Sequence, residues 1–189
     1  MEAKLAYLNR HNPDIKIVSP EEAVFLEAGL VPSLWKYLLT EPDFEEQKVL
    51  LLNAWAIFEP ELSNTVSYLA EHLIGIDLIT HNSRYSLLYV IKNTEDAILY
   101  YEGGNPFQKE PAASLEAFWD NLPAKLSGFY DLLHNGFYYY ADESTGLSPV
   151  ESVTSGSDRS YTFCGKVSIT DNGFWKAVDR WMVIGFEAS

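Results

Sequence analysis

A short helical segment that ends in Asn-Gly constrains the fold of this chain more than any other feature. Its apolar side chains recur at helical spacing, at Leu126, Phe129, Tyr130 and Leu133. Pro123 suits the first position of a helix, because its φ is fixed near the helical value and an N–H at that position would have no partner within the helix. Asn135-Gly136 can end the helix, since glycine adopts a left-handed backbone conformation without strain. The sequence therefore predicts a helix over 122–135 and a sharp exit into the next element.

The composition favours a substantial hydrophobic core. Hydrophobic residues make up 47% of the 189 residues and aromatic residues 14%, which is enough apolar surface for one domain or one domain with an extension. No segment approaches the run of about 18 apolar residues expected of a membrane span, and the N-terminus lacks the apolar core of a secretory signal. A single cysteine, Cys164, excludes an intramolecular disulfide. We therefore expect a cytoplasmic protein.

The chain is strongly acidic. Its 27 acidic and 13 basic residues give a net charge of −14 with histidine neutral. Such a charge repels nucleic acid and anionic membrane surfaces, so binding to either is not expected. Solubility is the simplest explanation of the charge, and electrostatic attraction of a basic protein partner is the alternative.

The N-terminal half is predicted to be mostly helical. Ser19-Pro20-Glu21-Glu22 has the pattern of a capping box, with Ser19 as the N-cap. The packed face of that helix would hold Ala23, Phe25, Leu26 and Leu30. Further helices are expected between Pro32 and Pro42, over 44–58, where a buried strand is the alternative, and over 62–73. Residues 85–91 and 97–101 then predict a β-hairpin.

Gly103-Gly104-Asn105-Pro106 interrupts this pattern and predicts a boundary. The chain would divide into an extension over 1–103, with helices and a hairpin, and a module over 104–189, with one continuous domain as the alternative. The module is expected to hold a helix capped by Ser114, strands over 137–140, 161–169 and 181–186, and a long exposed loop over 142–158. The predicted fold class is α+β, with an antiparallel or mixed sheet flanked by helices.

The search for reactive chemistry yields no strong candidate. Gly103-Gly104 lacks the spacing of a nucleotide-binding loop, and the four histidines lie in separate segments without the spacing of a metal site. Cys164 could be a nucleophile activated by His134, but its aromatic and aliphatic neighbours favour a place in the core. No pair of carboxylates is identifiable as an acid and base. We therefore expect a protein without catalytic residues, metal or cofactor.

Acidic residues near an aromatic run are the best candidates for a partner-binding surface. Charge combined with aromatic anchors is typical of protein interfaces. The candidates are Asp142, Glu143, Glu151 and Asp158, together with Tyr138 and Tyr140. Solvated loop residues are the alternative explanation of the acids, and a strand covered on both faces is the alternative for the tyrosines.

The helical segment over 122–135 resembles the helix signature of the SUKH superfamily, which includes fungal regulators of cell-wall glucan synthesis and bacterial immunity proteins. The resemblance rests on Leu122-Pro123, the Phe129-Tyr130 pair and Asn135-Gly136, followed later by Ile184-Gly185-Phe186. It covers roughly 114–189. The region before Gly103 and the end of the chain at Ser189 depart from the family pattern, which has a further turn and strand.

The resemblance implies an α+β domain that acts by binding. Many relatives neutralise a protein toxin, often a nuclease with a basic surface, which an acidic protein could block. The expected function is therefore that of a non-enzymatic immunity protein with a basic toxin domain as its partner. A regulatory scaffold of the cell-wall type is the alternative, and an unrecognised hydrolase is a third hypothesis.

Overall fold

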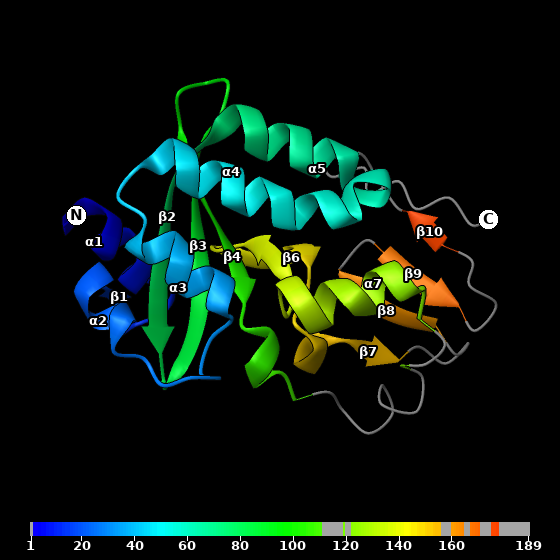
Figure 1. Cartoon of the computed structure of the whole chain (residues 1–189). Coiled ribbons are helices and arrows are strands. Elements are labelled where there is room, and N and C mark those ends of the chain that lie inside the picture. Colours follow the sequence, from blue (N-terminus) through cyan, green and yellow to red (C-terminus); the bar gives the residue numbers. More distant parts are fainter. Residues whose placement is uncertain are drawn as a thin grey trace.

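The computed structural model of the chain describes residues 2–110, 119, 122–155, 160–164, 167–170 and 175–177. Within these residues the fold is α+β, with six α-helices, most of them N-terminal, and a six-stranded antiparallel sheet (Figure 1). The predicted fold class is confirmed at this level, and the sheet is antiparallel rather than mixed.

The α-helices are α1 (Glu2–His11), α2 (Pro20–Val24), α3 (Ser33–Thr40), α4 (Phe44–Trp55), α5 (Glu59–His72) and α7 (Ala124–Gly128). Short 3-10 turns are η1 (Ala56–Phe58), η2 (Pro106–Gln108) and η4 (Val150–Ser152), and η3 (Phe129–Leu133) is a π-helical turn. The main sheet comprises β1 (Lys16–Val18), β2 (Leu73–His81), β3 (Arg84–Lys92), β4 (Ile98–Gly104), β5 (Phe137–Tyr139) and β6 (Asp142–Leu147). A second antiparallel sheet contains β7 (Thr154–Ser155), β8 (Ser160–Cys164), β9 (Val167–Thr170) and β10 (Trp175–Ala177).

The predicted capping box begins α2. The Glu22 N–H donates to Ser19 Oγ over 3.2 Å, and the Ser19 N–H donates to Glu22 Oε2 over 2.8 Å. Two N–H groups that have no partner within the helix are satisfied in this way. The predicted packed face is only partly correct, because the helix ends at Val24: Ala23 is buried, whereas Phe25 is 85% exposed.

Removing the cap should destabilise the protein measurably. We expect Ser19→Ala to lower the free energy of unfolding by about 1 kcal/mol, because the Glu22 N–H then loses its acceptor. Chemical denaturation followed by circular dichroism measures this difference. Ser19→Thr keeps a hydroxyl at the cap and is the matched control. Equal losses in the two variants would contradict a role for the hydroxyl.

The helices expected in the N-terminal half are present. α3 lies between the two prolines that were predicted to bound it, and its buried side chains are Trp35, Leu38 and Leu39. The helical alternative for 44–58 is confirmed, because α4 and the short η1 turn occupy this segment. The structure also adds α1, which the sequence pattern did not predict.

The strands of the main sheet follow one another in chain order, from β1 to β6. The predicted hairpin is confirmed as β3 and β4, which pair from Ser86↔Gly104 to Lys92↔Ile98. β2, which was not predicted, pairs with β3 over its whole length. Because Gly103 of β4 pairs with Phe137 of β5, the sheet includes strands from both sides of the boundary expected after residue 103. The division into two parts itself stays a prediction.

Both faces of the sheet carry apolar layers. On one face, Leu87, Tyr89 and Ile91 of β3 belong to the main core beneath α3, α4 and α5 (Figure 1). On the other face, Leu88 and Val90 belong to a smaller cluster with residues of α1. This alternation is the period-two pattern of a strand.

Helix α1 is fixed to the second face by polar contacts. Lys4 Nζ donates to Asp77 Oδ2 of β2 over 2.6 Å, and the hydroxyls of Tyr7 and Tyr139 lie 3.1 Å apart. At the far end of α1, the Tyr140 hydroxyl donates to the Leu8 carbonyl over 3.1 Å. The helix therefore covers one part of this face in a defined position.

The segment that opened the sequence analysis is helical but shorter than predicted. Pro123 precedes α7 as its N-cap instead of occupying the first helical position, and the helix passes into the π-helical turn η3. Gly136 has a φ of +84°, so the predicted left-handed exit is confirmed. Ile184-Gly185-Phe186, the predicted strand over 181–186 and the Ser114 cap lie outside the described residues.

The prediction of a long exposed loop over 142–158 is wrong. β6, η4 and β7 occupy most of the segment, and the side chains of Leu147 and Val150 are buried. β6 forms because β5 offers it a pairing edge, which includes Phe137↔Leu147. The residue types of this segment favour turns and loops, so its own sequence does not indicate that it joins a sheet. The single strand expected over 161–169 is instead the pair β8 and β9.

Candidate functional site

A polar pocket of about 330 Å³ lies on the sheet face that α1 covers only in part. Ser86 of β3 lies on the same face as Leu88, and Glu102 of β4 pairs with Leu88. Tyr138 of β5 pairs in turn with Glu102. Under α1 this face of the sheet presents apolar side chains. Beyond the end of the helix it presents a hydroxyl, a carboxylate and a phenol from three adjacent strands.

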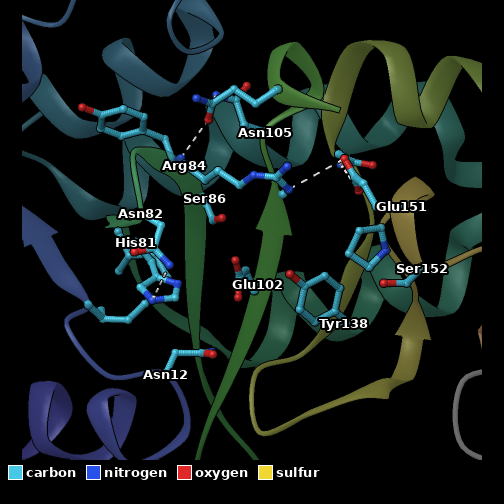
Figure 2. A pocket seen from close by; sticks show the side chains of 17 residues that line it. Asn12, His81, Asn82, Arg84, Ser86, Glu102, Asn105, Tyr138, Glu151 and Ser152 are labelled. Carbon is cyan, nitrogen blue, oxygen red and sulfur yellow. Dashed lines mark hydrogen bonds and ion pairs between the residues drawn. The ribbon is translucent and has the colours of Figure 1, made fainter. Parts of the chain in front are cut away.

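Figure 2 shows how these side chains lie around the opening. Glu102 lies between Ser86 and Tyr138, and Asn12, from the residues that follow α1, closes one end. Ser86 is 9% exposed and Tyr138 6% exposed, so the base of the pocket is largely shielded from solvent. Electrostatic interactions are stronger in such a place than on an open surface.

A hydrogen-bonded network forms the opposite rim. Asn135 Nδ2 donates to both carboxylate oxygens of Glu151, over 3.1 and 3.0 Å, and the Glu110 N–H donates to Oε1 over 2.7 Å. Asn135 Oδ1 accepts from the Val150 N–H over 3.0 Å. Arg84 Nη1 lies 3.9 Å from Glu151 Oε1. Asn135 of the Asn-Gly exit therefore also fixes the position of a carboxylate at the pocket.

The six predicted partner-binding residues are placed differently. Tyr138 and Glu151 both line the pocket. Tyr140 is buried against α1, where burial raises the pKa of its hydroxyl to about 12. Asp142 and Glu143 are the first two residues of β6. Their side chains, and the whole of Asp158, lie outside the described part of the structure.

The sequence analysis missed Glu102, Ser86 and Arg84, which the fold brings to the same pocket. A signal for Glu102 was present, because its carboxylate follows Ile98, Leu99, Tyr100 and Tyr101 in a strand of apolar and aromatic residues. An acidic residue inside such a strand needs a polar partner or solvent. The register that joins it to Tyr138 cannot be read from the strand alone.

His134, considered as an activating base for Cys164, is a core residue. Its ring is fully buried between aromatic side chains, with the ring centroids of Trp35 and Trp55 at 5.7 and 5.9 Å. Its Nε2 lies 2.6 Å from the Tyr89 hydroxyl, which accepts from Trp55 Nε1 over 3.0 Å. Since the hydroxyl already accepts that bond, its own proton is free to be donated to Nε2. A structural role for this histidine therefore accounts for its contacts.

Burial lowers the pKa of His134 to about 3, and the backbone of Gly104 opposes this effect only in part. Its Nδ1 has no hydrogen-bond partner of standard geometry among the described residues. The ring lies directly against Gly103, where a Cβ atom would come within 2.4 Å of Nδ1. The imidazole is thus held neutral, and its close fit against β4 requires glycine at residue 103.

Within the described ranges, no group of three or more His, Cys, Asp or Glu side chains is arranged to hold a metal ion. None of the helices in the part of the chain that the structure describes is long and apolar enough to cross a membrane. Comparisons with protein-family models, with curated proteins and with solved structures found no match. The candidate site is therefore argued from the pocket itself.

Proposed function

We propose that this chain is a non-enzymatic immunity protein of the SUKH type, which neutralises a toxin by binding its basic domain inside the cell. The single observation that carries the proposal is that Tyr138 and Glu151, two residues predicted to bind a partner, line one pocket together with Glu102. The sequence resemblance through Leu122-Pro123 and Asn135-Gly136 supports the same class of protein.

The charge of the protein fits a basic partner. A net charge of −14 attracts a positively charged domain over a long range, which raises the association rate at low salt. The carboxylates of Glu102 and Glu151 line the same pocket as the ring of Tyr138. Aromatic residues carry much of the binding energy at protein interfaces when they lie in a pocket that excludes water.

Co-expression with the toxin-like product of a neighbouring gene tests the proposal. We expect this chain to restore growth of cells that express the toxin domain, and the two purified proteins to elute together from a size-exclusion column. Raising the salt concentration should slow their association, because screening weakens the long-range attraction. The matched control is the toxin domain expressed with an unrelated acidic protein of similar size.

Continued killing without a complex, while this chain is expressed and folded, would reject the proposal. Purification of the chain with several endogenous proteins of its own cell, and with no toxin, would favour the regulatory scaffold instead. Mass spectrometry of the proteins that purify with this chain distinguishes a toxin partner from endogenous partners.

A further inference from the structure

We infer that the outer edge of β1 binds a short extended segment of the basic partner, which joins the main sheet as a further strand. This inference rests on the proposed function and deepens it by naming the structural element through which the partner binds. β1 stands first in the order of the main sheet, and within the described residues it pairs with β2 alone. It lies beside α1 and α2 at the border of the sheet (Figure 1).

The turn between β2 and β3 shows which way the backbone groups of β2 point. Asn82-Ser83 has positive φ at both residues, as a type I′ turn requires. The pair that flanks such a two-residue turn, His81↔Arg84, exchanges backbone hydrogen bonds between β2 and β3. Because the direction of these bonds alternates along a strand, Leu78 and Thr80 bond to β1 instead.

The backbone groups of Ile17 therefore point away from the sheet. The partners of Leu78 and Thr80 in β1 are Val18 and Lys16, which direct their N–H and C=O groups to β2. Ile17 lies between these two residues, so its own N–H and C=O point the opposite way. Neither group has a hydrogen-bond partner in the part of the chain that the structure describes.

The same edge is closed on either side of Ile17. Two residues before it, the Ile15 N–H donates to Asn9 Oδ1 of α1 over 3.1 Å. Two residues after it, the Ser19 N–H donates to Glu22 Oε2 over 2.8 Å. One N–H and one C=O, both of Ile17, are thus left for pairing. In an antiparallel pair a single residue of an added strand can exchange both bonds, so the edge suits a short segment.

A groove of about 540 Å³ follows this edge and reaches both faces of the sheet. On one face it is lined by Leu5 of α1 and by Ile17, which pack against the smaller apolar cluster. On the other face it is lined by Val18 of the main core and by Leu26, which packs against that core. Because successive side chains of a strand point to opposite faces, an added strand would fill both parts of the groove. β-branched apolar residues suit such a segment.

The charge of the chain favours a basic partner over a second copy. Two copies would each bring a net charge of −14 to a shared sheet, and their repulsion opposes pairing edge to edge. The ends of β1 carry the exposed residues Asp14, Glu21 and Glu22, whereas Lys16 is the only basic residue between them. We therefore expect lysine or arginine on either side of the apolar part of the segment.

The groove adjoins the polar pocket of the candidate site, because Ile15 and Tyr85 line both. One partner can therefore pair with the edge of the sheet and contact the pocket at the same time. When a peptide adds to a sheet edge, main-chain hydrogen bonds provide affinity, and side chains that enter the flanking pockets provide specificity. The groove on both faces of β1 supplies such pockets.

A synthetic peptide tests the inference without the partner. Acetyl-Lys-Val-Ile-Val-Lys-amide is titrated into the full chain, and amide chemical shifts and hydrogen exchange are followed by NMR. We expect saturable shifts at Ile17, Val18 and Leu26 with a millimolar Kd, and slower exchange of the Ile17 amide proton. The matched control peptide carries an N-methyl group on its central isoleucine, which removes one N–H and keeps every side chain. We expect it to bind at least tenfold more weakly.

A proline variant tests the edge within the protein. Ile17→Pro removes the outward N–H, while the hydrogen bonds of Lys16 and Val18 to β2 remain possible. The matched control is Thr94→Pro in the exposed turn between β3 and β4, at a turn position that suits proline. We expect Ile17→Pro to weaken peptide binding at least tenfold and Thr94→Pro to leave the Kd unchanged. Circular dichroism verifies that both variants are folded, and the two peptides compared on wild type need neither variant.

Three results would overturn the inference. The first is the absence of saturable shifts with the lysine peptide, or equal binding of its N-methylated form. The second is an unchanged Kd in folded Ile17→Pro. The third is a dimer of the chain alone on a size-exclusion column that becomes a monomer in Ile17→Pro, because a second copy would then occupy the edge.

The same variants separate this inference from the proposed function. In the co-expression assay, we expect Ile17→Pro to protect cells less well than Thr94→Pro does. Full protection by Ile17→Pro would overturn the edge site while the proposed function stands. Failure of the wild-type chain to protect against the toxin would instead reject the proposed function.

Discussion

Replacing Gly136 with alanine should lower the free energy of unfolding by about 2–5 kcal/mol. Gly136 has a φ of +84°, a conformation that costs a residue with a side chain about 1–2 kcal/mol. The new Cβ would also come within 2.7 Å of the Pro149 nitrogen and 2.8 Å of the Leu147 oxygen. Because these are backbone atoms, relief of the overlap requires a shift of the chain after β6, which adds about 1–3 kcal/mol.

Gly29 provides a matched control for this substitution. It also has a φ of +84°, but a Cβ atom there would meet nothing within 4 Å. We expect Gly29→Ala to cost only the conformational part, about 1–2 kcal/mol. Urea denaturation of the two variants measures both values. If the two substitutions cost the same, close packing of the Asn-Gly exit against the segment after β6 would be contradicted.

A second large effect is expected on acidification, because His134 is buried as a neutral ring. Its pKa is about 3 in the folded protein and 6.5 in the unfolded chain, so between these values the unfolded chain binds one more proton. The free energy of unfolding should therefore be highest above pH 6.5 and fall by about 1.4 kcal/mol per pH unit as the pH decreases. Between pH 7 and pH 4 this histidine alone should cost about 3 kcal/mol.

The contribution is measured by comparing wild type with His134→Gln at several pH values. Glutamine does not titrate, and its side-chain oxygen can replace Nε2 as the acceptor of the Tyr89 hydroxyl. We expect the variant to be less stable at pH 7 but to lose about 3 kcal/mol less than wild type on going to pH 4. Ile91→Val weakens the same core while His134 stays in place, and it should keep the wild-type pH dependence. If the free energy of unfolding changed equally with pH in wild type and in His134→Gln, a neutral buried imidazole would be contradicted.

The features that could be predicted from the sequence are those that depend on neighbouring residues. The capping box at Ser19 involves atoms three residues apart, and the left-handed exit at Gly136 depends on one backbone angle. The hairpin of β3 and β4 also forms around a short turn, in which Asn93 Oδ1 accepts from the Glu95 and Ala97 N–H groups. Local chemistry determines such elements, so their pattern is visible in one sequence.

The features that were missed depend on what a segment packs against or pairs with, which its own residues do not indicate. β2 has both Leu78 and Ile79 buried, because helices cover both faces of the sheet there, so the alternation typical of a half-exposed strand is lost. β6 is made of residues that favour turns and is a strand because β5 lies beside it. The pocket was missed because Glu102 meets Tyr138 only through the register of β4 and β5, two strands that are separated by more than thirty residues in the chain.

The chain order of the strands has a consequence for how the protein folds. β2, β3 and β4 pair with their neighbours in sequence, whereas the pairing of β4 with β5 must wait for residues beyond 136. Contacts between nearby segments form faster, because they close short loops. We therefore expect the three-stranded unit over 73–104 to assemble early, during synthesis, and the β5 strand to dock later and complete the pocket as a final step.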